Sequence, residues 1–344
     1  MPLPQKICLL RKANSRMGIL DTWNQYREAK KNQRQKKSDL IDLIERMVQD
    51  SDPSIRKVAG YRKQLKQPVE NALGHIESLI SSIPGPFSLT TEAWDKDPLI
   101  HALFVSPDEI RSLLQNCVDL KSFFQKSGMR TTVALLSATK KERTVFGTDQ
   151  QGEIVRRDVP QVAVEFHDHR VVAPGADEAE NRRELFHRGL YVLATHTLEE
   201  ILRIHSIKEE LSEERRILAV KIKIQHSRER GLEGLLAGGG KSSESSEQAK
   251  QLLEEIDNQL MELEPGSGKP QDFLRKLEKV LLDPGNFLTG KPIRMRLNWM
   301  GVKQSEESAE NAPEITLAEL EIPGKVKRVA ALVAVFAEEC AAAA

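Results

Sequence analysis

The sequence predicts an α+β protein that is predominantly helical, with a long antiparallel helical hairpin, a small β insertion and a small C-terminal β region. Three observations lead to this prediction. Only 5% of the 344 residues are aromatic and 30% are charged, a composition typical of solvated helices rather than one large globular core. Apolar residues recur at helical spacing through most of the chain. Two stretches, residues 141–174 and 291–338, have strand-like patterns instead.

The N-terminal part is predicted to be a basic arm, residues 1–37, followed by a helical domain, residues 38–140. Ser38 is a suitable helix N-cap, and the apolar residues after it lie one helical turn apart. Pro84-Gly85-Pro86 should end the next helical stretch, and Pro107 occupies the first position of another helix. The apolar positions of the first helix are Leu40, Ile41, Leu43, Ile44, Met47 and Val48.

The β insertion is predicted as a three-stranded antiparallel sheet within residues 141–174. The pattern predicts a hairpin formed by residues 143–147 and 153–159 around a polar turn. It predicts a third strand at residues 161–172. Pro174-Gly175 should close this sheet.

The long helical hairpin is predicted for residues 177–264, with a Gly/Ser-rich tip at residues 231–247. Asp177 opens its first arm, and the second arm should fold back on the first. The second arm carries four apolar residues at 3-4-3 spacing, which predicts a helical seam. These residues are Leu253, Ile256, Leu260 and Leu263.

The C-terminal part is predicted to hold a short helix, residues 271–283, and a small β region, residues 291–338, with an acidic loop at residues 304–314. Residues 326–336 are almost all apolar, which is typical of a central strand buried on both faces. The sequence leaves open whether this region and the β insertion share one sheet.

Charge and cysteine content restrict the classes to which the protein can belong. The chain has 51 basic and 51 acidic residues, which excludes a globally basic nucleic-acid-binding protein. Its three cysteines form no metal-binding or disulfide spacing, and no apolar run is long enough for a signal peptide or a membrane span. We therefore expect a cytoplasmic protein.

One candidate metal site is predicted in the β insertion. Glu165, His167 and His169 occupy every second position, so on a regular strand all three side chains lie on the same face. Two imidazoles and a carboxylate are suitable ligands for a divalent metal. The alternative interpretation is a solvated strand face without any ligand, in which case no cofactor is expected.

The basic arm is a second candidate site. Residues 1–37 contain ten basic and two acidic residues, and Trp23 and Tyr26 lie among them. This arm could be a solvated helix start, could contact an acidic protein surface such as residues 304–322, or could bind nucleic-acid phosphates. The contact residues in the last two cases are Arg11, Lys12, Arg16, Arg27, Lys30, Lys31, Arg34, Lys36 and Lys37.

No catalytic arrangement of nucleophile and base is recognisable, and no small-molecule substrate can be identified. Cys117 lies on the apolar face of a helix, so we interpret it as a core residue. We expect a scaffold or adaptor that acts through helix-mediated protein–protein contacts or self-association. The alternatives are a metal-dependent enzyme using Glu165, His167 and His169, and a nucleic-acid-associated protein using the basic arm.

Overall fold

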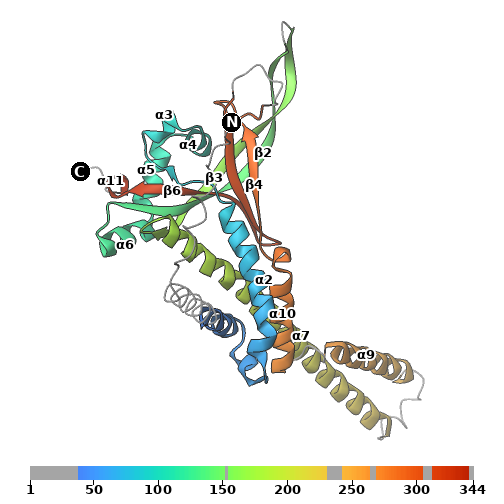
Figure 1. Ribbon diagram of the computed structural model, residues 1–344. Coiled ribbons are helices and arrows are strands. Elements are labelled where there is room, and N and C mark those ends of the chain that lie inside the picture. The colour runs from blue at the N-terminus through green and yellow to red at the C-terminus, as the bar shows by residue number, and fades with distance from the viewer. Residues whose placement is uncertain (1–37, 152–153, 231–241, 264–268, 305–311, 341–344) are drawn as a thin grey trace, which may run out of the picture.

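The computed structural model describes residues 38–151, 154–230, 242–263, 269–304 and 312–340. Its centre is one six-stranded sheet with the strand order β3-β2-β6-β5-β4, and β1 pairs with β6 in parallel (Figure 1). All other neighbours are antiparallel. The strands are β1 (Phe87–Ser88), β2 (Thr131–Gln151), β3 (Ile154–Gly175), β4 (Thr289–Arg296), β5 (Glu314–Ile322) and β6 (Val326–Phe336).

Strand β6 lies at the middle of the sheet, between β2 on one side and β5 with β1 on the other. Its side chains alternate between two hydrophobic cores. Ala330 and Leu332 belong to the first core, whereas Val329, Ala331 and Val333 belong to the second. The strand is therefore buried on both faces, which explains its apolar sequence.

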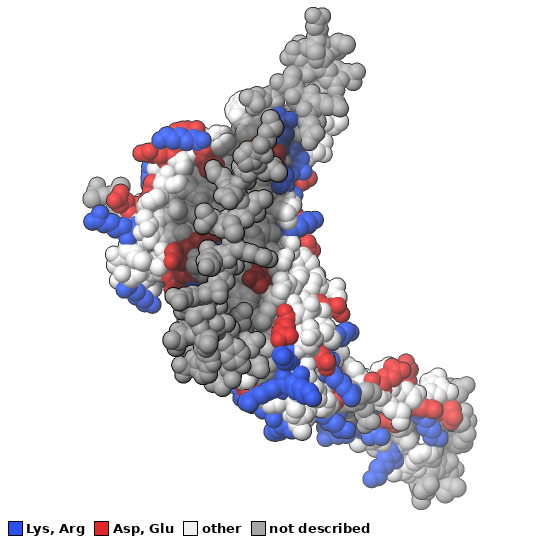
Figure 2. All heavy atoms as spheres, in the orientation of Figure 1, with Lys and Arg blue, Asp and Glu red and all other residues white. Residues whose placement is uncertain are grey.

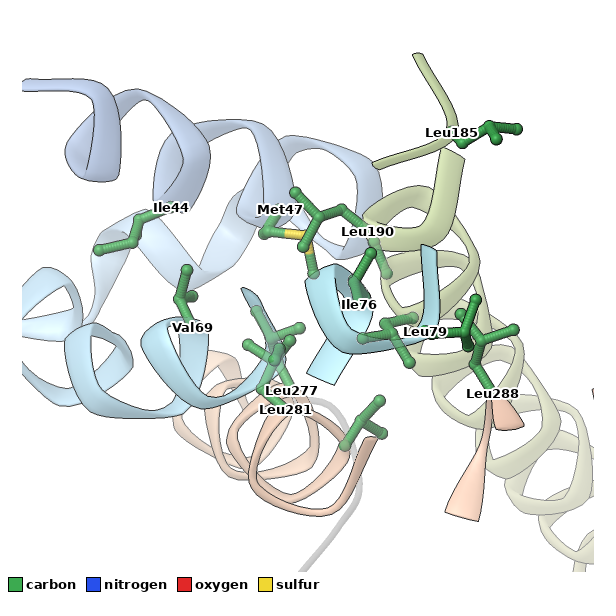
Figure 3. Packing of buried hydrophobic residues seen from close by; sticks show 14 of the residues in the cluster. Ile44, Met47, Val69, Ile76, Leu79, Leu185, Leu190, Leu277, Leu281 and Leu288 are labelled. Atoms are coloured by element: carbon green, nitrogen blue, oxygen red, sulfur yellow. The ribbon is translucent and has the colours of Figure 1, made fainter. Parts of the chain in front are cut away.

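The first core lies between the sheet and three long helices, α2 (Tyr61–Ser81), α7 (Glu178–Arg230) and α10 (Pro270–Leu282). These helices run side by side below the sheet in Figure 1, and residues 38–51 form a further helix beside them. Figure 3 shows Ile76 and Leu79 of α2 facing Leu190 of α7 and Leu277 of α10. The apolar stripe of each helix thus meets a stripe of its neighbour.

The second core lies on the opposite face, beneath short helices from residues 93–127. Pro98 and Pro107 occupy the first turns of α4 and α5, where a missing amide proton costs nothing. The helices here are α3 (Ala93–Lys96), α4 (Pro98–Leu103), α5 (Pro107–Asn116), α6 (Val118–Ser127) and, from the C-terminal end, α11 (Ala337–Cys340). Further elements are two short 3-10 helices, Pro53–Lys57 and Pro284–Asn286, and helix α9 (Ser242–Leu263).

The predicted long helical hairpin of residues 177–264 is wrong. Helix α7 has 53 residues and α9 has 22, so the two are not matched arms. The first half of α7 packs against α2, α10 and the sheet, and α9 lies only beside its distal half (Figure 1). The first half of α7 is part of the first core, through Leu185, Leu190 and Leu193. Helical periodicity alone does not show whether such an apolar face packs on a second hairpin arm or on a distant core.

The prediction of two small β regions is also wrong. Strands β2 and β3 have 21 and 22 residues, and they share one sheet with β4, β5 and β6. Strand β2 begins at Thr131, inside the predicted helical domain of residues 38–140, and β3 is continuous through Pro160. The far ends of β2 and β3 extend beyond the sheet as a ribbon (Figure 1). Pro160 is accommodated because β3 is an edge strand.

Basic and acidic side chains are interspersed on the part of α7 and α9 that projects from the body (Figure 2). No helix in the described part of the chain is both long enough and apolar enough to cross a membrane.

Candidate functional site

Within the described parts of the chain, the outer edge of β3 is only partly covered. Residues 297–303 form a small β-hairpin that reaches this edge, and residues 301–303 run antiparallel to it. The Val164 amide donates to the Gly301 carbonyl at 2.8 Å, and the Lys303 amide donates to the Val162 carbonyl at 2.8 Å. The loop is held by Asn298, whose Oδ1 accepts from the Met300 and Val302 amides at 3.1 and 2.9 Å. A short piece of the same chain therefore already serves as a neighbouring strand.

This pairing stops at Gly301. Its backbone has a positive φ of 74°, and its amide donates to the Asn298 carbonyl instead of to β3. In an antiparallel ladder, outward-facing amide and carbonyl groups recur at every second residue. Since the Val164 amide points outward and the register of residues 164–166 is unbroken, the amide and carbonyl of Phe166 point outward as well. Among the described residues, no hydrogen bond reaches these two groups.

A groove of about 540 Å³ lies at this free edge, and we call it the β3-edge groove. Residues 164–167 of β3 form its floor. Trp94, with residues 101–105 around the end of α4, forms one wall, and residues 298–301 form the other. Three large apolar side chains at the groove are exposed to solvent, namely Val105 (83%), Trp299 (75%) and Met300 (61%). Exposed apolar groups concentrated at one concave place are typical of binding surfaces.

The wall from α3 and α4 is held by specific hydrogen bonds. Trp94 Nε1 donates to the Phe104 carbonyl at 2.8 Å, and the Trp94 and His101 rings lie 4.5 Å apart. Asp97 caps α4 by accepting from the Leu99 amide at 2.8 Å. The Val105 amide donates to Glu109 Oε2 at 2.9 Å, which fixes the loop that presents Val105. The groove wall is therefore preformed.

The three residues of the predicted metal site do not lie together. Glu165 and His167 share the solvent face of β3, where Glu165 pairs with Arg143 at 2.6 Å and lies 3.4 Å from His167 Nε2. His169 lies on the other face, because a β-bulge intervenes. Three residue steps on β3, from His167 to Arg170, face two on β2, and Asp168 has a φ of 53°. Within the described residues, no group of three potential metal ligands is found.

His169 instead contacts α5 and the residue that follows α4, and so holds β3 against these helices. Its side chain is only 4% exposed, its Nδ1 lies 3.1 Å from Glu109 Oε1, and its ring stacks on Phe104 with the centroids 4.4 Å apart. Burial lowers the pKa of His169 below its ordinary value of 6.5, although Glu109 and the Leu103 carbonyl act in the opposite direction.

We expect the free energy of unfolding to fall between about pH 7.5 and pH 5.5, and to fall less in a His169→Gln variant. Because the folded-state pKa is depressed, the unfolded chain takes up the proton first, so stability present above the ordinary value of 6.5 is lost below it. Urea unfolding of both chains at the two pH values measures this. His187, whose pKa is lowered by burial, should leave a residual slope in the variant, and equal slopes would contradict the prediction.

Cys117 lies between α5 and α6 and is half-buried, and its thiol donates to the Val171 carbonyl at 3.3 Å. It borders a second cavity of about 550 Å³ together with Glu109 and His169. The side chain packs against the second core.

The helical seam lies where α9 contacts α7. Ile256 is buried at 5% exposure, and Leu253, Leu260 and Leu263 are half-buried. Arg215 of α7 pairs with Asp257 of α9 at 2.5 Å beside them. The basic arm, residues 1–37, and most of the acidic loop lie outside the described residues, so nucleic-acid binding through the arm stays a prediction.

The β3-edge groove has no continuous signature in the sequence. Its parts come from residues 94–105, 164–167 and 298–301, and no periodicity links segments so far apart. The one local sign was Asn298-Trp299-Met300-Gly301, a turn sequence with two large apolar residues in its centre. Comparisons with protein-family models, with curated proteins and with solved structures find no significant match to this chain.

Proposed function

We propose that this protein is an adaptor that binds a segment of a partner protein in the β3-edge groove. The observation that carries the proposal is the combination of an unpaired strand edge with three exposed apolar side chains, Val105, Trp299 and Met300. Aromatic residues and methionine are enriched at protein interfaces, and tryptophan is among the most frequent energetic hot spots.

The chemistry of the groove supports recognition rather than catalysis. Its lining is mostly apolar, and its carboxylate, Glu165, is already paired with Arg143 and close to His167. The helical seam on α9 is the less suitable surface for a partner, because α7 already covers it. Among the described elements, none occupies the β3-edge groove in the way that α7 covers the seam.

Selection of 12-residue displayed peptides on the full chain tests the proposal. Peptides that bind the native chain should lose affinity by about tenfold or more for the Trp299→Ala variant, because truncating an aromatic anchor removes most of its contact area. Isothermal titration with synthetic peptides gives the affinities. Thermal unfolding should show no more than a small change, since Trp299 is 75% exposed.

The matched control is Tyr191→Ala on α7, which removes an aromatic residue that is 58% exposed and does not line the groove. Affinity for the selected peptides should be unchanged in this variant. The proposal fails if no peptide is enriched, or if the enriched peptides bind the Trp299→Ala and native chains equally.

A further inference from the structure

The backbone groups on the floor of the β3-edge groove indicate the conformation of the partner segment. We infer that it is extended and adds to the outer edge of β3 as a short β-strand, with one of its residues exchanging both backbone hydrogen bonds with Phe166. This inference rests on the proposed function and specifies how the groove is used.

An incoming strand would continue a β-ladder that already exists at this edge of β3. Residues 301–303 show that this edge of β3 accepts an antiparallel neighbour, with the Val164 amide and the Val162 carbonyl hydrogen-bonded to it. The next outward-facing pair of groups belongs to Phe166, and it lies on the floor of the groove. A strand placed there would continue a ladder that Gly301 interrupts.

The open edge of β3 limits the length of the segment that can be added. It is bounded at one end by Gly301, opposite Val164, and at the other by the bulge at Asp168. Beyond the bulge, His169 is covered by its contacts with Glu109 of α5 and with Phe104. At about 3.3 Å per residue, the open edge has room for about four residues of an incoming strand.

The walls of the groove determine which side chains of the segment are recognised. Successive side chains of a strand point to opposite faces, so only alternate residues of the segment would face the apolar walls formed by Trp94, Phe104 and Trp299. Residues paired directly across an antiparallel ladder point to the same face, and Phe166 shares the second core with Phe104 and Trp94. We therefore expect the segment to carry one large apolar residue at the position that pairs with Phe166. Sequence preference at its other positions should be weak, because backbone groups make the remaining contacts.

An N-methyl scan of the strongest-binding peptide from the selection tests this inference. Methylating the one amide that donates to the Phe166 carbonyl should weaken binding by about tenfold, since it removes a hydrogen bond and adds bulk at the strand edge. Methylating the amides on either side, which would point away from β3, should have little effect. Isothermal titration against the full chain measures the series.

Amide hydrogen exchange of the full chain provides an independent readout. With the same peptide at saturation, exchange of the Phe166 amide should slow by about tenfold or more, whereas the Glu165 amide, which faces β2, should change little. If peptides bind in a Trp299-dependent manner but the scan shows no alternation and the Phe166 amide is not protected, strand addition is wrong and the adaptor proposal survives. If no peptide binds, both fail.

Discussion

A Gly85→Ala variant should be strongly destabilised, with a loss of more than about 3 kcal/mol in the free energy of unfolding. Gly85 has a φ of 111°, a backbone conformation that side chains disfavour. A Cβ atom there would lie well inside van der Waals contact with the carbonyl oxygen of Leu332. The adjacent Pro84 carbonyl accepts from the Leu332 amide at 2.8 Å, so the loop has little freedom to move away from β6.

Urea unfolding of the native and variant chains measures this loss. Gly74→Ala in α2 is the matched control, because a Cβ atom there would meet nothing within 4 Å. Alanine in a helix interior is favoured over glycine by about 1 kcal/mol, so this control should be as stable as the native chain or more so. A Gly85→Ala chain of native stability would contradict the close packing of residues 84–86 on β6.

A Leu193→Ala variant should lose about 3 to 5 kcal/mol of stability, whereas Leu202→Ala on the same helix should change it by less than about 0.5 kcal/mol. Leu193 is fully buried in the first core, and Leu202 is 58% exposed. Since both substitutions change helix propensity equally, their difference isolates the burial of α7.

Chemical denaturation of the two variants tests whether the first half of α7 belongs to the first core. The expected difference follows if the first half of α7 is part of the core beside α2 and α10. Equal effects of the two substitutions would mean that Leu193 is not packed as described, and that α7 behaves as a solvated arm along its whole length.

Local sequence signals predicted several elements well. The apolar run of residues 326–336 predicted the central strand, and β6 spans those residues. The short helix predicted for residues 271–283 is α10, which spans Pro270–Leu282. The predicted start at Asp177 agrees with α7, where Asp177 accepts from the Glu180 amide at 2.8 Å. Caps, breakers and apolar runs act over a few residues, so the sequence shows them directly.

Periodicity failed where a single inserted residue changed the faces of a strand. The prediction that Glu165, His167 and His169 share a face assumes regular alternation, and the bulge at Asp168 turns His169 to the opposite side. That bulge depends on the pairing of β3 with β2 and on the contacts of His169 with Glu109 and Phe104. None of these partners is adjacent in the sequence.

The sequence by itself determined the mixed α+β composition, the positions of many helix ends and the central apolar strand, because these depend on neighbouring residues. Only the tertiary structure decided that the β segments form one sheet, that half of α7 belongs to the core, and that a groove borders Phe166. Burial of an apolar face is satisfied equally well by a hairpin partner or by a distant sheet, so the pattern specifies the face but not what covers it.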